Sequence, residues 1–212
     1  CLYVPLVNSK GFMVNDPVII KISDEKYWIS IADSDVLLWM DGIVSALNLD
    51  VDVSEPDISP LAIQGPKSEI LASKLFGSKI KKLNFFDVEN FKFEGQELLI
   101  AKSGYSKQGG YELYVTGPQI AVKLWNTFFE EGKELNVRAG CPNLIEMIEV
   151  GLLSYGNDMT IENTPFECGF EKFVPKKVLN ECLSAESLNS IEIRCPKKII
   201  KSLSIDCEKK IY

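Results

Sequence analysis

One carboxylate, Glu112, stands inside an otherwise apolar stretch, directly behind a loop rich in hydrogen-bonding side chains. The loop and the stretch read SGYSKQGGYELYV over residues 103–115. Gly109 and Gly110 lack a β-carbon, so a ligand can approach the backbone closely. A carboxylate that faces a planar heterocycle with adjacent N–H donors can accept two hydrogen bonds at once. The pattern indicates a ligand-binding strand, and the alternative is an ordinary solvated sheet face.

Chemistry that depends on histidine is excluded, because the 212 residues contain no His. Ser-His-Asp triads, Cys-His dyads and His-rich metal sites all need that side chain. None of the six Cys residues forms a C-x-x-C pair, so we expect no metal site. What remains is chemistry by carboxylates, amides, Tyr and Lys, or by a bound cofactor.

The charge of the chain limits its partners. The net charge is -7 at pH 7, so the surface as a whole does not attract nucleic acid or anionic lipid. The longest apolar runs are much shorter than a membrane span. We therefore expect a cytoplasmic protein with reduced thiols and a small-molecule partner, no nucleic acid and no membrane. The oligomeric state stays open.

Strand alternation decides which way Glu112 points. Alternate side chains of a strand share a face, so Glu112 shares its face with Tyr114. The opposite face is apolar and consists of Tyr111, Leu113 and Val115. A helix that begins at Pro118 carries a wide apolar stripe. We expect the apolar face to pack on that helix, which directs Glu112 away from it.

The rest of the pattern predicts an α+β fold with mixed or antiparallel sheets and packed helices. Strands are expected over residues 2–7, 12–22, 26–32, 59–64 and around 51–53. Further helices are expected after a cap at Ser34, over 67–76 and after Pro142. The last of these should turn Leu144, Ile148 and Leu152 toward the core and end near Gly156, with Asp158 bonding turn amides.

Several long strings resemble the glycine cleavage T-protein (aminomethyltransferase) family. The run from Gly104-Tyr105 to Glu112 is similar to the family's folate-binding strand, G-Y-x-x-x-x-G-Y-E. LYVPLVNSKGFMVNDPVII, SPLAIQGP and GLLSYGNDMT resemble other segments of the family. YWISIADSD, EPDISPLAIQGPK and PNLIEMIEVGLLSYGNDMT look most similar to its dimethylsulfoniopropionate demethylase subgroup.

The resemblance implies tetrahydrofolate as cofactor. In the family, the Glu that matches Glu112 binds the pterin ring, and the Tyr that matches Tyr105 lies beside it. Tyr3 matches a pocket tyrosine, with an edge-strand aromatic as the alternative. Ser30 and Ala32 match a strand that lines the pocket, with plain alternation as the alternative. Phe85-Phe86 matches an aromatic position beside the ligand, with a core pair as the alternative.

Two departures from the family bear on the reaction. The aminomethyl-transferring members have an Asp-Asp pair at the catalytic place, where this chain has Asn15-Asp16. An amide neither takes nor gives a proton near neutral pH, which suits methyl transfer from a sulfonium group. On the helix after Pro142, Asn143, assigned here to cofactor binding, and Met147 stand where the family tends to have Arg. Tyr3 and Trp28 are expected to meet the sulfonium by cation–π contact.

The expected function is tetrahydrofolate-dependent methyl transfer from a sulfonium or methylamine compound, which gives 5-methyltetrahydrofolate. The alternatives are aminomethyl transfer and a folate-binding protein without activity. We expect residues 1–56 and 57–175 to be two folate-binding α+β subdomains. Residues 176–212 are expected to be a linker and the first strand, at 198–206, of an incomplete C-terminal β-barrel domain. Both chain ends are interpreted as cut through structure, which predicts an internal piece of a longer protein.

Overall fold

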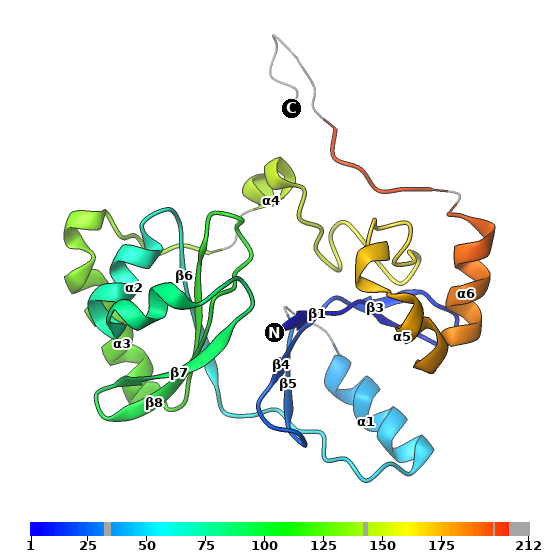
Figure 1. Cartoon of the computed structure of the whole chain (residues 1–212), viewed down its shortest axis with the longest axis horizontal. Helices are drawn as coiled ribbons and strands as arrows, with labels where there is room; N and C mark the ends of the chain where they lie inside the picture. The colour runs from blue at the N-terminus through cyan, green and yellow to red at the C-terminus, as the bar shows by residue number, and fades with distance from the viewer. Residues whose placement is uncertain (32–34, 142–143, 197, 204–212) are drawn as a thin grey trace. The chain divides into compact units, whose positions relative to one another are not determined.

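The computed structural model describes residues 1–31, 35–141, 144–196 and 198–203 (Figure 1). The chain divides into two compact units. The first unit contains Cys1–Leu2 and Val18–Asn143, and the second contains Tyr3–Pro17 and Leu144–Tyr212. These boundaries differ from the three parts expected from the sequence, 1–56, 57–175 and 176–212, which stay a prediction. The expected α+β class with antiparallel sheets and packed helices is confirmed.

A four-stranded antiparallel sheet forms the centre of the first unit. Its strands are β6 (Ser59–Gln64), β7 (Val88–Phe93), β8 (Gln96–Ala101) and β9 (Gly110–Val115), in the order β6-β9-β8-β7. The strand that carries Glu112 is therefore an inner strand, paired on both sides. In Figure 1 the helices α2 and α3 lie beside this sheet.

Helices cover one face of the sheet because that face is apolar. They are α2 (Ser68–Phe76), α3 (Pro118–Glu131) and the 3₁₀ turns η1 (Ser78–Lys82) and η2 (Lys133–Leu135). The side chains of Tyr111, Leu113 and Val115 are buried among residues from these helices, as the alternation predicts. Pro118 begins α3 because its fixed φ and missing N–H suit the first turn.

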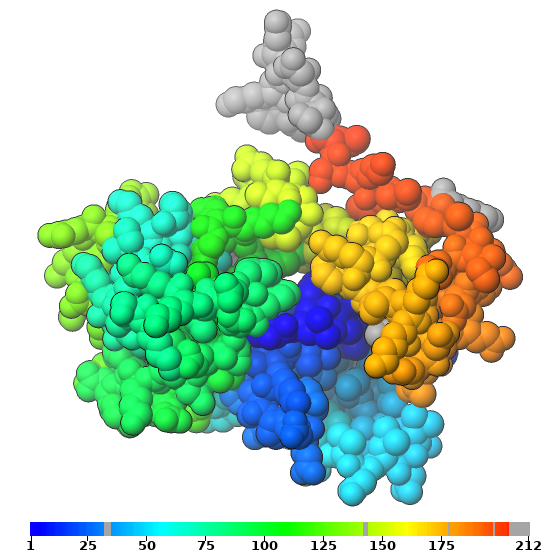
Figure 2. All heavy atoms as spheres, viewed as in Figure 1, coloured from blue at the N-terminus to red at the C-terminus, as the bar shows by residue number. Residues whose placement is uncertain are grey.

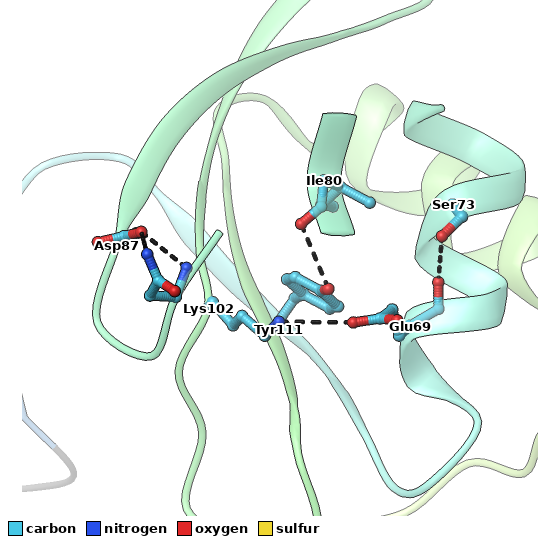
Figure 3. A network of polar contacts seen from close by, with 7 residues as sticks. Glu69, Ser73, Ile80, Asp87, Lys102 and Tyr111 are labelled. Atoms are coloured by element: carbon cyan, nitrogen blue, oxygen red, sulfur yellow. Dashed lines mark hydrogen bonds and ion pairs between the residues drawn. The ribbon is translucent and has the colours of Figure 1, made fainter. Parts of the chain in front are cut away.

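Polar contacts tie the sheet to the helical layer at Tyr111 (Figure 3). The Tyr111 hydroxyl donates to the carbonyl of Ile80 at 3.4 Å. Lys102 Nζ lies 5.7 Å from the centre of the Tyr111 ring and 3.5 Å from Glu69 Oε2 on α2. These bonds fix the start of β9 against the helices and turn its other face outward from this core.

The opposite face of the sheet is covered by a second, smaller sheet. β4 (Val18–Lys21) and β5 (Tyr27–Ser30) pair antiparallel and, with β1 (Leu2–Tyr3), have the order β1-β4-β5. Ile20, Ala101 and Tyr114 form a buried cluster there, with Trp28 packed against it. The face shared by Glu112 and Tyr114 is thus lined by protein, so the interpretation as a fully solvated face is wrong.

The helix α1 (Val36–Leu47) is apolar but mostly exposed. Val36 is buried at its start, whereas Leu38 is 70% exposed. Figure 2 shows this segment, in light blue to cyan, at the surface. The expected cap, Ser34, lies outside the described residues. The strand expected around 51–53 is wrong, because no strand of the described residues pairs with this segment and Val51 is exposed.

The second unit contains short elements around two small cores. Its strands β2 (Leu6–Val7) and β3 (Met13–Asn15) pair antiparallel. Its helices are α4 (Leu144–Val150), α5 (Lys176–Glu181), α6 (Ala185–Arg194) and the 3₁₀ turn η3 (Glu171–Phe173). One core gathers Met13, Met159 and Cys168, and the other gathers Phe166, Val174, Leu179 and Leu188.

Three expectations for the second unit are corrected. The helix α4 ends at Val150, before Gly151 with φ 67°, rather than near Gly156. Ile148 is 62% exposed and Leu144 is exposed too, whereas Met147 is buried at 8%, so the apolar row does not face the core. The strand expected over 198–206 does not form at 198–203, and 204–206 lie outside the described residues.

The turn after α4 behaves as expected. The Ser154 N–H donates to Asp158 Oδ2 at 3.0 Å, which gives Asp158 a structural role in the turn.

Among the described helices, none is both long and apolar enough to cross a membrane.

Candidate functional site

Glu112 lies in the middle of β9 between two small side chains. It pairs in register with Ala62 of β6 on one side and with Ala101 of β8 on the other. Ala62 is exposed, whereas Ala101 is fully buried against the smaller sheet, and Glu112 itself is partly buried. The open side of the carboxylate is therefore the side of Ala62.

A buried serine orients that carboxylate. Ser103, at the start of the loop between β8 and β9, is 4% exposed, and its hydroxyl donates to Glu112 Oε2. The bond engages one of the two oxygens and holds the plane of the carboxylate. Sequence reasoning named the loop but not Ser103. Its signal was a hydroxyl residue nine positions before Glu112, across a glycine-rich loop that reverses the chain.

Tyr114 lies on the same face as Glu112, as the alternation predicts, although no role at the site was expected for it. Its ring centre lies 5.7 Å from that of Trp28, with the planes tilted by 56°. Burial raises the pKa of Tyr114 to about 12, with the charge of Glu112 acting in the same direction and a side-chain hydrogen bond with Ser30 opposing them. Its contacts with Trp28 and Ser30 depend on tertiary partners, which alternation alone does not predict.

The structure brings Ser30, Trp28 and Glu112 to the same region of the first unit through Tyr114. Tyr105 lies on the loop between Ser103 and Glu112 and is partly buried. Ala32 and Asn143, expected to bind the cofactor, lie outside the described residues. For all of these residues the binding roles stay predictions.

Phe85 and Phe86 are stacked, with ring centres 4.2 Å apart and planes inclined by 27°. Phe85 is 66% exposed, so the alternative of a plain core pair is wrong for this residue. Phe86 adopts a positive φ of 71°, and its N–H donates to the carbonyl of Lys102 at 2.9 Å. The pair is an aromatic surface next to the segment that leads into the 103–110 loop.

The second unit holds a separate polar pair, Tyr3 and Asp16. The Tyr3 hydroxyl donates to Asp16 Oδ2 at 2.9 Å. The Tyr3 ring packs on Phe170 and Phe173, with ring centres 5.5 and 4.6 Å away. Tyr3 is therefore held at both its ring and its hydroxyl, although β1 is an edge strand of its sheet, and its binding role stays a prediction.

Burial perturbs the acid of this pair. Desolvation raises the pKa of Asp16 from 3.8 to about 6, against the hydrogen bond from Tyr3, which lowers it. The neighbouring Asn15 is 3% exposed, and its Oδ1 accepts from the Asp16 N–H at 2.8 Å. Burial also raises the pKa of the Cys168 thiol to about 11, with Glu167 and Asp16 adding to the effect.

The described residues thus offer an oriented carboxylate with nearby aromatic rings in the first unit, and a tyrosine–aspartate pair in the second. These groups can bind and orient a polar heterocycle or a cation. Within the described ranges, no three Cys, Asp or Glu side chains gather in a way that could hold a metal ion.

Comparison with known proteins decides the family. The family model described as the GCVT N-terminal domain matches residues 1–178. The chain belongs to this GCVT family. The resemblance to the T-proteins is confirmed by this match, which covers both the Tyr3 and Glu112 strands.

Two relatives of this GCVT chain show how far the likeness extends. The dimethylsulfoniopropionate demethylase of Ruegeria pomeroyi is 47% identical over 210 residues, which cover 98% of this chain and 57% of the relative. An aminomethyltransferase of a Thermoanaerobacter species is 32% identical over 180 residues, which cover 82% of this chain and 48% of the relative. The chain thus spans about half the length of the curated relatives it matches.

A solved structure shows the same fold. The crystal structure of the glycine cleavage system aminomethyltransferase T from Bartonella henselae superimposes with a TM-score of 0.73 and 21% identity. The superposition covers 92% of the GCVT chain and 53% of the other chain. At this identity the match concerns the fold alone, and it confirms the expected T-protein architecture.

Proposed function

We propose that this GCVT chain binds tetrahydrofolate and takes part in the transfer of a methyl group from a sulfonium substrate to it. The products are 5-methyltetrahydrofolate and a neutral thioether acid. The observation that carries the proposal is the 47% identity, over almost the whole chain, to a protein named dimethylsulfoniopropionate demethylase. The oriented carboxylate of Glu112 supports the folate part of the proposal.

In this account Glu112 recognises the pterin. Its carboxylate accepts hydrogen bonds from adjacent ring N–H groups, and such charge-assisted bonds are the stronger kind. The Ser103 hydroxyl keeps the carboxylate plane fixed, so less rotamer freedom is lost on binding. Tyr105 and Ser30 line the same site. Ala32 and Asn143, outside the described residues, are assigned to cofactor binding on the family resemblance alone.

The methyl donor is a cation, and the chain offers it aromatic rings and a carboxylate. Trp28 is packed on Tyr114, and Tyr3 on Phe170 and Phe173, so neither ring needs ordering when a ligand binds. Cation–π contact contributes roughly 0.5–2 kcal/mol at such a ring. Above pH 6 the ionised Asp16 adds an attractive charge.

The transfer needs no proton from the protein to the leaving group. The S–CH₃ bond breaks with its electron pair kept by sulfur, the methyl carbon bonds to N5 of tetrahydrofolate, and N5 releases its proton. The thioether leaves as a neutral molecule. The chain therefore contributes position and electrostatics, which agrees with an amide rather than a carboxylate at Asn15.

Aminomethyl transfer is the second candidate, because relatives of that name are about 30% identical. Asn15 argues against it. Its amide is 3% exposed and bonded to the Asp16 N–H, so it offers no titratable group at the place where the family resemblance implies Asp in aminomethyl-transferring members. A folate-binding protein without activity is the third candidate and shares the Glu112 prediction.

One assay separates the three candidates. The purified protein is incubated with dimethylsulfoniopropionate and tetrahydrofolate, and 5-methyltetrahydrofolate is quantified by mass spectrometry. We expect product from the wild type and from Glu97→Gln, which removes an exposed carboxylate from the same sheet. Glu112→Gln should form much less 5-methyltetrahydrofolate than the wild type. If only an aminomethyl-lipoyl carrier reacts, with release of ammonia and formation of 5,10-methylenetetrahydrofolate, methyl transfer is contradicted. Folate binding without either product would favour the inactive binder.

A further inference from the structure

The side chain of Gln64 joins the end of β6 to the loop that precedes Glu112. Its Nε2 donates to the carbonyl of Ser103 at 3.1 Å, and its Oε1 accepts from the Ser106 hydroxyl at 2.8 Å. One amide therefore binds two points of the 103–110 loop, although 39 and 42 residues separate it from them in the sequence.

Two glycines make room for this amide. A β-carbon at Gly104 would overlap the Gln64 amide, and one at Gly110 would overlap both the Ile63 carbonyl and the same amide. Both glycines also have positive φ, at 153° and 157°. The Gly65 N–H closes the arrangement by donating to the Gly109 carbonyl at 2.9 Å. Gly104 and Gly110 thus make room for a protein side chain.

Ser103 connects this arrangement to the candidate site. Its carbonyl accepts from Gln64, and its hydroxyl donates to Glu112. Gln64 therefore fixes the Ser103 backbone, and the Ser103 hydroxyl in turn holds the Glu112 carboxylate. The two Gln64 bonds and the Gly65–Gly109 bond thus join β6 and the residue after it to the first half and to the end of the loop.

We propose that Gln64 is a positioning residue that orders the 103–110 loop and, through Ser103, orients Glu112 for its ligand. The ligand part of this inference rests on the proposed function, whereas the ordering of the loop does not. Glutamine suits the role because it combines a donor and an acceptor on one planar group. The Gln64→Glu substitution would keep the acceptor for Ser106 but turn a second acceptor toward the Ser103 carbonyl.

Amide hydrogen exchange of the loop tests the ordering directly. Peptides that cover residues 103–110 are compared by mass spectrometry in the wild type, Gln64→Ala, Gln64→Glu and Ser106→Ala. We expect exchange in this segment to be about tenfold faster in Gln64→Ala and about threefold faster in Ser106→Ala. Gln64→Glu should resemble Gln64→Ala despite its similar shape.

A matched control distinguishes the loop from general loosening. Ser73→Ala also removes one hydroxyl that donates to an oxygen, here the Glu69 carbonyl on α2, away from the loop. Its loop peptides should exchange as in the wild type. Exchange in peptides that cover α3 should be unchanged in every variant, which shows that the first unit stays folded. Equal loop exchange in the wild type and Gln64→Ala would overturn the proposal.

Calorimetric titration with tetrahydrofolate then tests the orientation of Glu112. If Gln64 positions the carboxylate, Gln64→Ala weakens binding about tenfold, whereas Ser73→Ala leaves it unchanged. Faster amide exchange of the loop in Gln64→Ala, together with an unchanged affinity for tetrahydrofolate, would overturn the positioning role. Absence of binding by the wild type would contradict the proposed function instead, and the exchange comparison would still confirm or overturn the ordering of the loop by Gln64.

Discussion

Ser103 begins the loop before β9 and Glu112 lies within β9, and the hydroxyl of the first donates to the carboxylate of the second. The bond explains how an acid can lie in an inner strand. The carboxylate is partly buried, so it needs a donor, and Ser103 supplies one while the exposed Ala62 beside Glu112 leaves one side open. A group oriented in this way is prepared for a ligand with N–H donors.

Ser103→Ala should weaken tetrahydrofolate binding without unfolding the protein. A hydrogen bond to a charged group contributes about 1.5–3 kcal/mol. The fraction of this energy that keeps the carboxylate oriented is lost from the free energy of ligand binding. We expect the dissociation constant to rise about 5- to 30-fold by calorimetry. Ser73→Ala serves as the matched control. An unchanged dissociation constant would show that Ser103 does not orient the binding carboxylate.

Asp16→Asn should stabilise the protein at alkaline pH and not at acidic pH. The pKa of Asp16 is raised from 3.8 to about 6, so the folded state binds this proton more tightly than the unfolded state. The resulting stability is fully present below pH 3.8 and is lost as the pH rises through 6. Asn keeps an oxygen that can accept from Tyr3.

The difference in the free energy of unfolding between Asp16→Asn and the wild type should therefore grow between pH 4 and 7 and level off above that range. Its upper limit is about 3 kcal/mol, from the size of the pKa displacement. Urea unfolding at pH 4, 5, 6, 7 and 8 measures it. A difference that stays constant over these pH values would refute the account of Asp16 as a desolvated carboxyl.

Asn15→Asp should destabilise the second unit near neutral pH. Asn15 is 3% exposed and adjacent to an acid that already ionises with difficulty, so a second carboxylate there would be desolvated and repelled. We expect a loss of about 1–3 kcal/mol at pH 8 and a smaller loss at pH 5, measured by urea unfolding. Asn8→Asp, in the turn between β2 and β3, provides a comparison. Equal losses at both pH values would contradict this expectation.

The sequence predicted the features that depend on local pattern. Alternation correctly separated Glu112 from the apolar face of Tyr111, Leu113 and Val115, because an inner strand must turn one face to its helices. Pro118 marked the start of α3 for the same local reason. The long strings shared with the T-proteins indicated the family and the fold, which the family match confirms.

The sequence failed where the outcome depends on tertiary partners. Val51 and Val53 read as a strand, but a strand needs a neighbour to bond with, and none lies beside them in the described part of the chain. The apolar row of α4 was expected to be buried, yet Met147 on another side of the helix is the buried residue. Ser103 and Gln64 escaped notice because their partners are fixed by the folded loop rather than by spacing.

The most direct test of the account is the titration of tetrahydrofolate into the wild type, Glu112→Gln and Glu97→Gln. Glutamine keeps the shape of Glu112 but loses the charge, and it faces the ring N–H groups with only one acceptor oxygen. We predict that Glu112→Gln loses at least about 100-fold in affinity, or about 2.7 kcal/mol, while Glu97→Gln binds as the wild type does. Equal affinities for the wild type and Glu112→Gln would contradict the central claim that Glu112 binds the folate.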